Sequence, residues 1–133
     1  MNEQNEMLKN CLQLLDSDGI LLINVPNAFS IHRILGAYMG KLESIHSLTE
    51  TQLIMQQINP PFTPETLRVL LQNNGFQIES IFTVLPKLLD HKNLSDVIEA
   101  GLIDRYFLAN LNKLAGKLDG FGSEIIAIAR KNG

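Results

Sequence analysis

Four polar side chains follow closely on a short apolar segment. The apolar segment covers residues 20–25, and the polar residues after it are Asn27, Ser30, His32 and Arg33. An imidazole titrates near pH ~6.5 and can accept a proton from a ligand, whereas amide, hydroxyl and guanidinium groups can hydrogen-bond a ligand or pair with an acid. The spacing predicts a small-molecule site with His32 as the catalytic base and the other three as substrate-binding residues.

Each of these residues also has a structural interpretation. His32 can pack against a loop or cap it, since one histidine without a visible partner is weak evidence for a base. Asn27 suits a turn because asparagine tolerates left-handed geometry. Ser30 suits a helix cap, and Arg33 suits a solvated helix face. The sequence leaves both interpretations open.

The remaining histidines and the cysteine do not extend this cluster. His46 and His91 have no metal-ligand spacing with His32 or Cys11, so we expect no metal site. Cys11 is the only cysteine, which excludes an internal disulfide.

The segments that must position the cluster come first along the chain. Apolar residues recur at helical spacing over residues 7–15, and Gly19 follows as a stop signal. Residues 20–25 form an almost unbroken apolar run that predicts a strand buried on both faces. Pro26 ends it, because proline cannot donate the next ladder hydrogen bond.

Helical patterns fill most of the middle of the chain. Residues 34–42 predict a short helix, and the SLTE motif at 47–50 has the spacing of a capping box that opens another. Thr63 and Pro64 predict the first turn of a longer helix, which Gly75 would end with a left-handed cap.

The last part of the chain adds two strands. Residues 78–84 and 123–131 are typical of strands, the final one buried on both faces, and residues 94–118 predict one or two helices interrupted near Gly101. Strands alternating with helices indicate an α/β fold, in which ligands bind beyond the carboxyl ends of parallel strands.

Composition limits the classes of partner. With 133 residues, 45% of them hydrophobic, the chain can bury one core, so residues 1–133 are expected to form a single unit. The net charge of −3 and the scattered lysines and arginines argue against nucleic-acid or anionic-membrane binding. No segment has the roughly 18 apolar residues of a membrane span, and the N-terminus does not resemble a leader, so a cytoplasmic location is expected.

Four motifs in order resemble one protein family. DSDGILLINVPNAFSIHRILGAYMG, LTE, FTPETLRVLLQNNGFQIESI and GSEIIAIARK together are similar to the C-terminal half of a class I S-adenosylmethionine-dependent methyltransferase, over about residues 8–130. The resemblance implies a partial Rossmann-like fold with flanking helices and a three-stranded mixed sheet. Its strands would correspond to the family's strands five, seven and six in spatial order, the last in sequence running antiparallel to its neighbours.

The chain lacks the pattern that binds the cofactor in this family. A Gly-rich turn between a strand and a helix, with an acidic residue on the next strand, is missing. Gly120 and Gly122 precede a strand rather than a helix. The resemblance therefore implies the acceptor-side portion of an enzyme, as a fragment or half of a split protein. S-adenosylmethionine would bind the intact parent but not this chain alone, which we expect to be inactive.

Two interpretations of function follow. In the first, the parent enzyme methylates a small-molecule acceptor. In the second, the chain is a non-catalytic oligomerisation or interaction module derived from a methyltransferase. In both, the strand at residues 20–25 lacks the neighbour it has in the family, so we expect association with a missing N-terminal half or a homo-oligomer. A homodimer would form through this strand or through the helix at residues 7–15.

Overall fold

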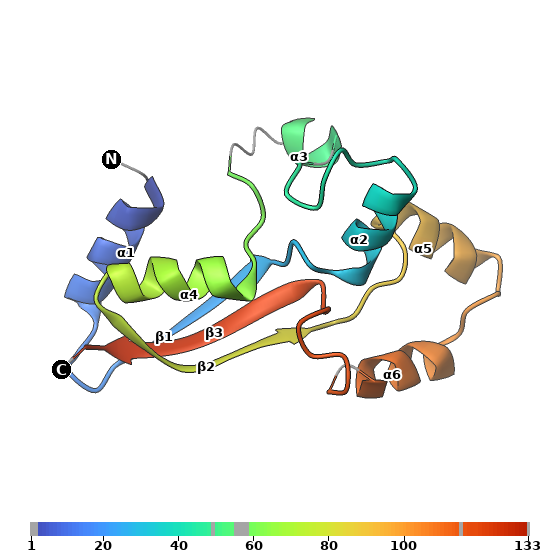
Figure 1. The fold of residues 1–133 in the computed structure, drawn as a ribbon. Helices are drawn as coiled ribbons and strands as arrows, with labels where there is room; N and C mark the ends of the chain where they lie inside the picture. Colours follow the sequence, from blue (N-terminus) through green and yellow to red (C-terminus); the bar gives the residue numbers. More distant parts are fainter. Residues whose placement is uncertain (1–2, 49, 55–58, 115, 133) are drawn as a thin grey trace.

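The computed structural model describes residues 3–48, 50–54, 59–114 and 116–132, which form six helices and three strands (Figure 1). In chain order these elements are α1 (Glu3–Leu14), β1 (Ile20–Pro26), α2 (Ile31–Tyr38), α3 (Glu50–Ile54), α4 (Pro64–Asn73), β2 (Phe76–Val84), α5 (His91–Glu99), α6 (Arg105–Leu114) and β3 (Glu124–Lys131).

Local sequence signals explain the boundaries of α4. The Thr63 hydroxyl accepts a hydrogen bond from the Thr66 backbone N–H at 3.1 Å, and the Thr66 hydroxyl accepts one from the Thr63 N–H at 2.8 Å, which forms a capping box. Pro64 occupies the first turn, where no backbone donor is needed. Gly75 follows the helix with a φ of 87°, as predicted.

Local signals also explain the boundaries of α5 and α6, whereas α2 begins earlier than predicted. Asp90 caps α5 by accepting from the Asn93 N–H at 2.8 Å, and Gly101, with a φ of 72°, separates α5 from α6 as predicted. Helix α2 begins at Ile31 rather than at residue 34, and α3 begins at Glu50. The predicted capping box for α3 includes residue 49, which lies outside the described residues.

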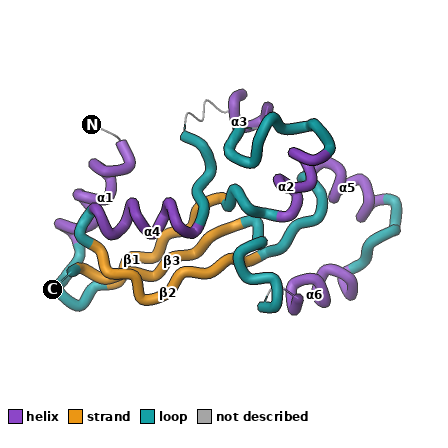
Figure 2. The backbone as a smooth tube through the Cα atoms, in the orientation of Figure 1, coloured by secondary structure: helices purple, strands orange, loops and turns teal. Residues whose placement is uncertain are grey.

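The sheet has the spatial order β1-β3-β2 (Figure 2). Strand β3 pairs antiparallel with β1, as in Leu22 with Ile128, and antiparallel with β2, as in Phe82 with Ile126. The predicted order and the reversed last strand are confirmed, but the description of the sheet as mixed was wrong. Strands β1 and β2 run in the same direction, yet β3 separates them, so every adjacent pair is antiparallel.

One face of the sheet carries the core. Helices α1 and α4 lie on this face (Figure 1), and burying their apolar stripes against β2 and β3 removes apolar surface from water at roughly 25 cal/mol per Å². The buried residues are Leu8, Leu67, Leu71, Phe76, Ile125, Ala127 and Ala129.

No helix among the described residues covers the opposite face of the sheet along most of its length. Burial alternates along β1, and the side chains of Ile20 and Leu22 are 52% and 63% exposed. On β3, Ile126 and Ile128 are only half-buried. The prediction that β1 and β3 are buried on both faces was therefore wrong, because helices α1 and α4 form a layer on one side alone.

A close approach of two backbone segments fixes the end of β2. A Cβ atom built on Gly122 would lie 2.4 Å from the Val84 carbonyl oxygen, so only glycine fits there. The segment before β3 therefore lies directly against the last residue of β2.

None of the described helices has the length and apolar character needed to cross a lipid bilayer.

Candidate functional site

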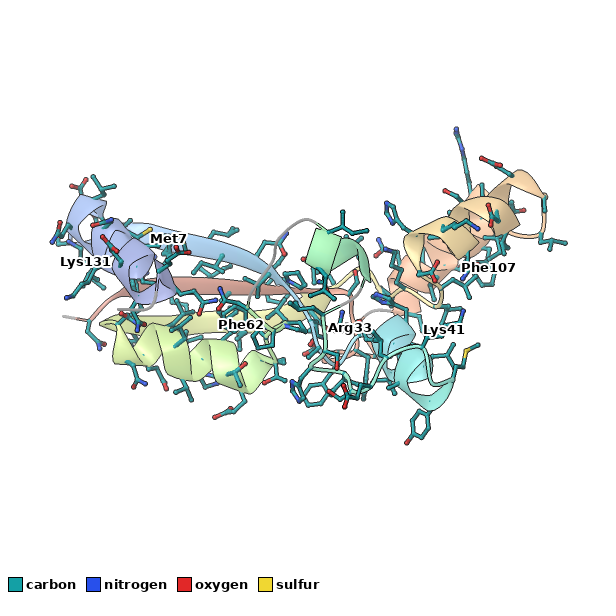
Figure 3. The ribbon with its side chains drawn as sticks, turned by 90° about the horizontal axis from the view of Figure 1, so that it is seen from above. Met7, Arg33, Lys41, Phe62, Phe107 and Lys131 are labelled. Carbon is teal, nitrogen blue, oxygen red and sulfur yellow. The ribbon has the colours of Figure 1, made fainter. Side chains whose placement is uncertain are left out.

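The predicted site residues lie at one end of the sheet, where three chain segments meet. Pro26 at the end of β1 and Val84 at the end of β2 both pair with Glu124 at the start of β3. The segments after β1, after β2 and before β3 therefore lie side by side. Helices α5 and α6 lie beyond this end of the sheet, and Lys131 lies at the far end of the molecule (Figure 3).

The side chain of Asn27 is fully buried and holds the segment before β3. Its Nδ2 donates to the Gly120 carbonyl at 2.9 Å and to the Gly122 carbonyl at 2.8 Å, while its Oδ1 accepts from the Phe29 N–H at 3.0 Å. Both amide hydrogens are thus used within the chain. Asn27 acts here as a positioning residue, and a direct contact with substrate stays a prediction.

Thr83 holds the same segment from the β2 side. Its hydroxyl oxygen accepts from the Gly120 N–H at 2.8 Å and from the Gly122 N–H at 3.1 Å. The Asp119 carboxylate accepts in turn from the Thr83 N–H at 3.1 Å. Sequence reasoning missed Thr83 and Asp119 because 36 residues separate them and no local pattern connects them.

Arg33 is buried, with 4% of its surface exposed, so the alternative of a solvated helix face was wrong. Its Nε donates to the Ile45 carbonyl at 3.1 Å, and its Nη2 donates to the Ser47 carbonyl. Burial lowers the pKa of this guanidinium below its usual range. Arg33 therefore anchors the chain that follows α2 and leaves a positive charge beside His32.

Ser30 occupies the N-cap position of α2, but its hydroxyl makes no capping hydrogen bond. The side chain is fully buried, and its Oγ has no hydrogen-bond partner in the described part of the chain. The position thus agrees with the capping interpretation, whereas the bond that defines a cap is absent. A buried hydroxyl without a partner costs about 1–3 kcal/mol, which marks Ser30 as an unusual feature of this site.

His32 lies in the first turn of α2 with its Nδ1 atom buried and, among the described residues, without a partner. Burial, together with the positive charges of Lys87 and Arg33, lowers the pKa of the imidazole from 6.5 to about 4, and the negative charge of Asp90 opposes this shift. The imidazole is therefore neutral at pH 7. Its protonation state is that of a proton acceptor, although the low pKa makes it a weak one.

Two charged residues from the other strands complete the cluster. Lys87, after β2, lies near both His32 and Glu124, and its Nζ is 3.0 Å from the His91 Nδ1 atom. Burial raises the pKa of the Glu124 carboxyl group, and Lys87 opposes that rise. Their positions directly after β2 and at the start of β3 were the available signal, because polar residues at strand ends gather at one sheet edge.

Within the described residues, no three His, Cys, Asp or Glu side chains are grouped closely enough to hold a metal ion.

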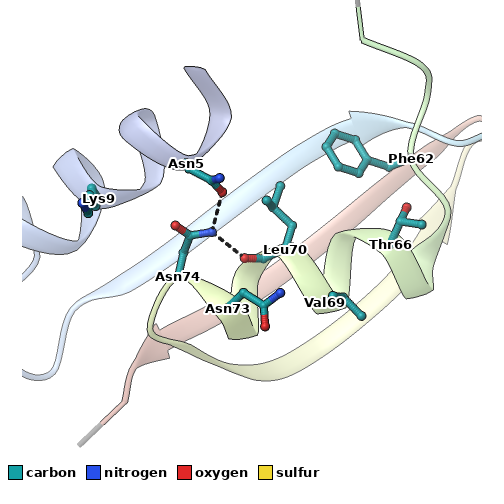
Figure 4. Close-up of a pocket in the computed structure, with 8 residues that line it drawn as sticks. All are labelled: Asn5, Lys9, Phe62, Thr66, Val69, Leu70, Asn73 and Asn74. Atoms are coloured by element: carbon teal, nitrogen blue, oxygen red, sulfur yellow. Dashed lines mark hydrogen bonds between the residues drawn. The ribbon is translucent and has the colours of Figure 1, made fainter. Parts of the chain in front are cut away.

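A groove of about 600 Å³ lies away from the cluster, between α1 and α4 (Figure 4). There the Asn74 Nδ2 donates to the Asn5 Oδ1 at 2.9 Å and to the Leu70 carbonyl at 2.8 Å, which ties the two helices together.

Comparison with known proteins adds no family to these findings. The sequence matches no protein-family model, and no curated protein matches it.

Proposed function

We propose that this chain is the acceptor-side portion of an S-adenosylmethionine-dependent methyltransferase that acts on a small molecule. The observation that carries the proposal is the order of the sheet. A final strand inserted antiparallel between two strands that run in the same direction is what the sequence resemblance implies, and β3 has this place between β1 and β2.

The polar cluster supports an acceptor side in this enzyme. Ligands of α/β folds bind beyond the carboxyl ends of strands, and the cluster lies beyond those of β1 and β2. His32, neutral at pH 7, would accept the proton of an oxygen or nitrogen acceptor, and the charge of Lys87 favours an acidic acceptor. Asn27 and Arg33 would position the segments around it, with Ser30 as a hydrogen-bonding group.

The residues of this chain do not fit the cofactor itself. Both carbonyls of Gly120 and Gly122 bind Asn27, and both N–H groups bind Thr83, so this Gly-x-Gly segment has no free backbone groups for a ligand. The parent enzyme would bind S-adenosylmethionine through residues outside this chain. The parent is proposed to work in the cytoplasm without a nucleic-acid or membrane partner.

The test measures transfer of a labelled methyl group to a small molecule. We would read the transcript upstream of the Met1 codon, then express the complete assembly with tritiated S-adenosylmethionine and a small-molecule extract. We expect a Gly-rich strand–turn–helix upstream or in a neighbouring gene, and label transfer only with the complete assembly. Titration calorimetry of the 133-residue chain alone should show no saturable binding of S-adenosylmethionine. Micromolar binding of S-adenosylmethionine by this chain alone would contradict the proposal that the cofactor binds to residues outside it.

A second candidate function is a non-catalytic interaction module. It is favoured by the outer edge of β1, where in the described chain only a bridge between Asn27 and Phe62 contacts the strand end. The Ala28 N–H donates to the Phe62 carbonyl at 2.7 Å there, and no other described strand pairs with this edge, which could therefore pair with a strand of another chain. A complete assembly that never transfers label, yet binds other chains through this edge, would favour the module.

A further inference from the structure

We infer that the open face of the sheet packs against the same face of a second copy of this chain, with β3 antiparallel to the partner's β3. This interface requires only the described sheet, and it does not depend on methyl transfer. It differs from pairing through the β1 edge or through α1, because the strands of the two copies would stack rather than extend one sheet.

The open face carries an apolar patch, with the exposed polar residues Asn24 beside Ile126 and Ser80 beside Ile128. Cross-strand register places its side chains in rows, with Leu22 of β1 beside Ile128 of β3, and Ile126 of β3 beside Phe82 of β2. Helices α1 and α4 lie on the other side of the sheet (Figure 1), so no described helix covers these rows. The apolar residues of this face are Ile20, Leu22, Phe82, Val84, Ile126 and Ile128.

Charge complementarity selects a second copy as the occupant. The open-face residues of β3 are, in order, Glu124, Ile126, Ile128 and Arg130, so an acid and a base lie at opposite ends of one apolar row. A two-fold axis perpendicular to the strands places Glu124 opposite the partner's Arg130, and this contact occurs twice. A two-fold axis along the strands would instead place like charges together, which is unfavourable.

The Glu124 carboxylate and the Arg130 guanidinium can each form one more hydrogen-bonded ion pair. Glu124 has no ion-pair partner within the described residues, and burial already raises the pKa of its carboxyl group. Arg130 uses Nε for Glu79 and donates from Nη1 to the Asp18 carbonyl at 2.9 Å, which leaves Nη2 for a further acceptor. In the single chain Lys87 acts on Glu124 without forming an ion pair, and the partner's Arg130 would add a direct ion pair.

The size of the face predicts a weak dimer. Three strands spaced about 4.8 Å apart, each about seven residues long at about 3.3 Å per residue, give a flat area of roughly 15 by 20 Å. This lies below the roughly 800 Å² per partner of standard stable interfaces. We therefore expect a dimer that forms at tens of micromolar and weakens with salt.

Sedimentation equilibrium of the 133-residue chain from about 5 to 200 µM tests the interface. Leu22→Glu should abolish the dimer, while Val69→Glu, a control at an exposed position of α4, should leave it intact. Glu124→Arg alone and Arg130→Glu alone should each weaken the dimer about tenfold or more. A 1:1 mixture of these two variants should restore it, because each substituted position then faces the opposite charge.

Circular dichroism would first establish that each variant is folded. Restoration by mixing keeps the test valid even where one variant is less stable. A monomer at 200 µM would overturn the inference and indicate that another polypeptide covers this face. A dimer unaffected by Leu22→Glu, or a mixture no stronger than its components, would also overturn it and favour association through the β1 edge or α1.

Discussion

The Asn27 carboxamide and the Thr83 hydroxyl bind the same two glycines through opposite backbone groups. Asn27 donates to the carbonyls of Gly120 and Gly122, and Thr83 accepts from their N–H groups. The two side chains come from the ends of the two outer strands, β1 and β2, and bind the segment that precedes the central strand β3. These four hydrogen bonds hold the segment of Gly120 and Gly122 in place beside the candidate site without any ligand.

Asn27→Ala is expected to destabilise the fold. The substitution removes the donors of two carbonyls and the acceptor of the Phe29 N–H, all at a fully buried position. Because water reaches such groups poorly, we expect a loss of about 2–4 kcal/mol in the free energy of unfolding. Urea denaturation would measure it. Asn112→Ala on the exposed surface of α6 is the control and should change stability by less than about 0.5 kcal/mol.

Thr83→Val tests the other half of this clamp. Valine keeps the branched shape suited to a strand but leaves the N–H groups of Gly120 and Gly122 without their acceptor. We expect a loss of about 1–3 kcal/mol, and Thr83→Ser should recover most of it because the hydroxyl remains. In the double variant with Asn27→Ala the losses should not add, since both contacts hold one segment. Fully additive losses would show that the two contacts act independently.

His32 should make stability depend on pH in a defined window. Its pKa is about 4 in the folded protein and near 6.5 in the unfolded chain, so the unfolded chain binds more protons between these values. Its contribution is fully present above about pH 6.5 and is lost as the pH falls toward 4. After allowance for partial exposure, the loss is roughly 1–2 kcal/mol.

The measurement is a series of urea denaturations from pH 7.5 to 4 with His32→Gln as the comparison. The variant should show a flatter profile across this window, because its side chain does not titrate. Parallel profiles for the two proteins would show that another group causes the pH dependence. A direct nuclear magnetic resonance titration of the His32 ring would then locate its pKa.

Local signals in the sequence predicted the elements well, and the layers poorly. Thr63, Pro64 and Gly101 act through their own backbone geometry, so helix starts and breaks near them could be predicted. The exposure of Leu22 could not, because an apolar run does not reveal whether a second layer of helices covers the sheet. The strand order could be predicted only through resemblance to a family.

The position of the polar cluster after β1 was predicted from the sequence, whereas the contacts of its side chains were not. Four clustered polar residues correctly indicated the end of β1, because their spacing is local. Burial of Arg33 and the contacts of Asn27 depend on segments 12 or more residues away, as the Ile45 and Gly120 partners show. Thr83 was missed for the same reason, because only the tertiary structure brings it to the cluster. Lys87 was missed although its position after β2 was a usable signal.

In the complete enzyme, His32→Ala should lower turnover by about 10²-fold if the imidazole accepts the acceptor's proton. Binding of S-adenosylmethionine should change little, since we propose that the cofactor binds to residues outside this chain. The loss should shrink at high pH, where an acidic acceptor ionises without assistance. His46→Ala is the matched control, because His46 is exposed in the loop after α2, and it should leave turnover unchanged. Equal turnover of His32→Ala and the unmodified enzyme at every pH would assign His32 a structural role.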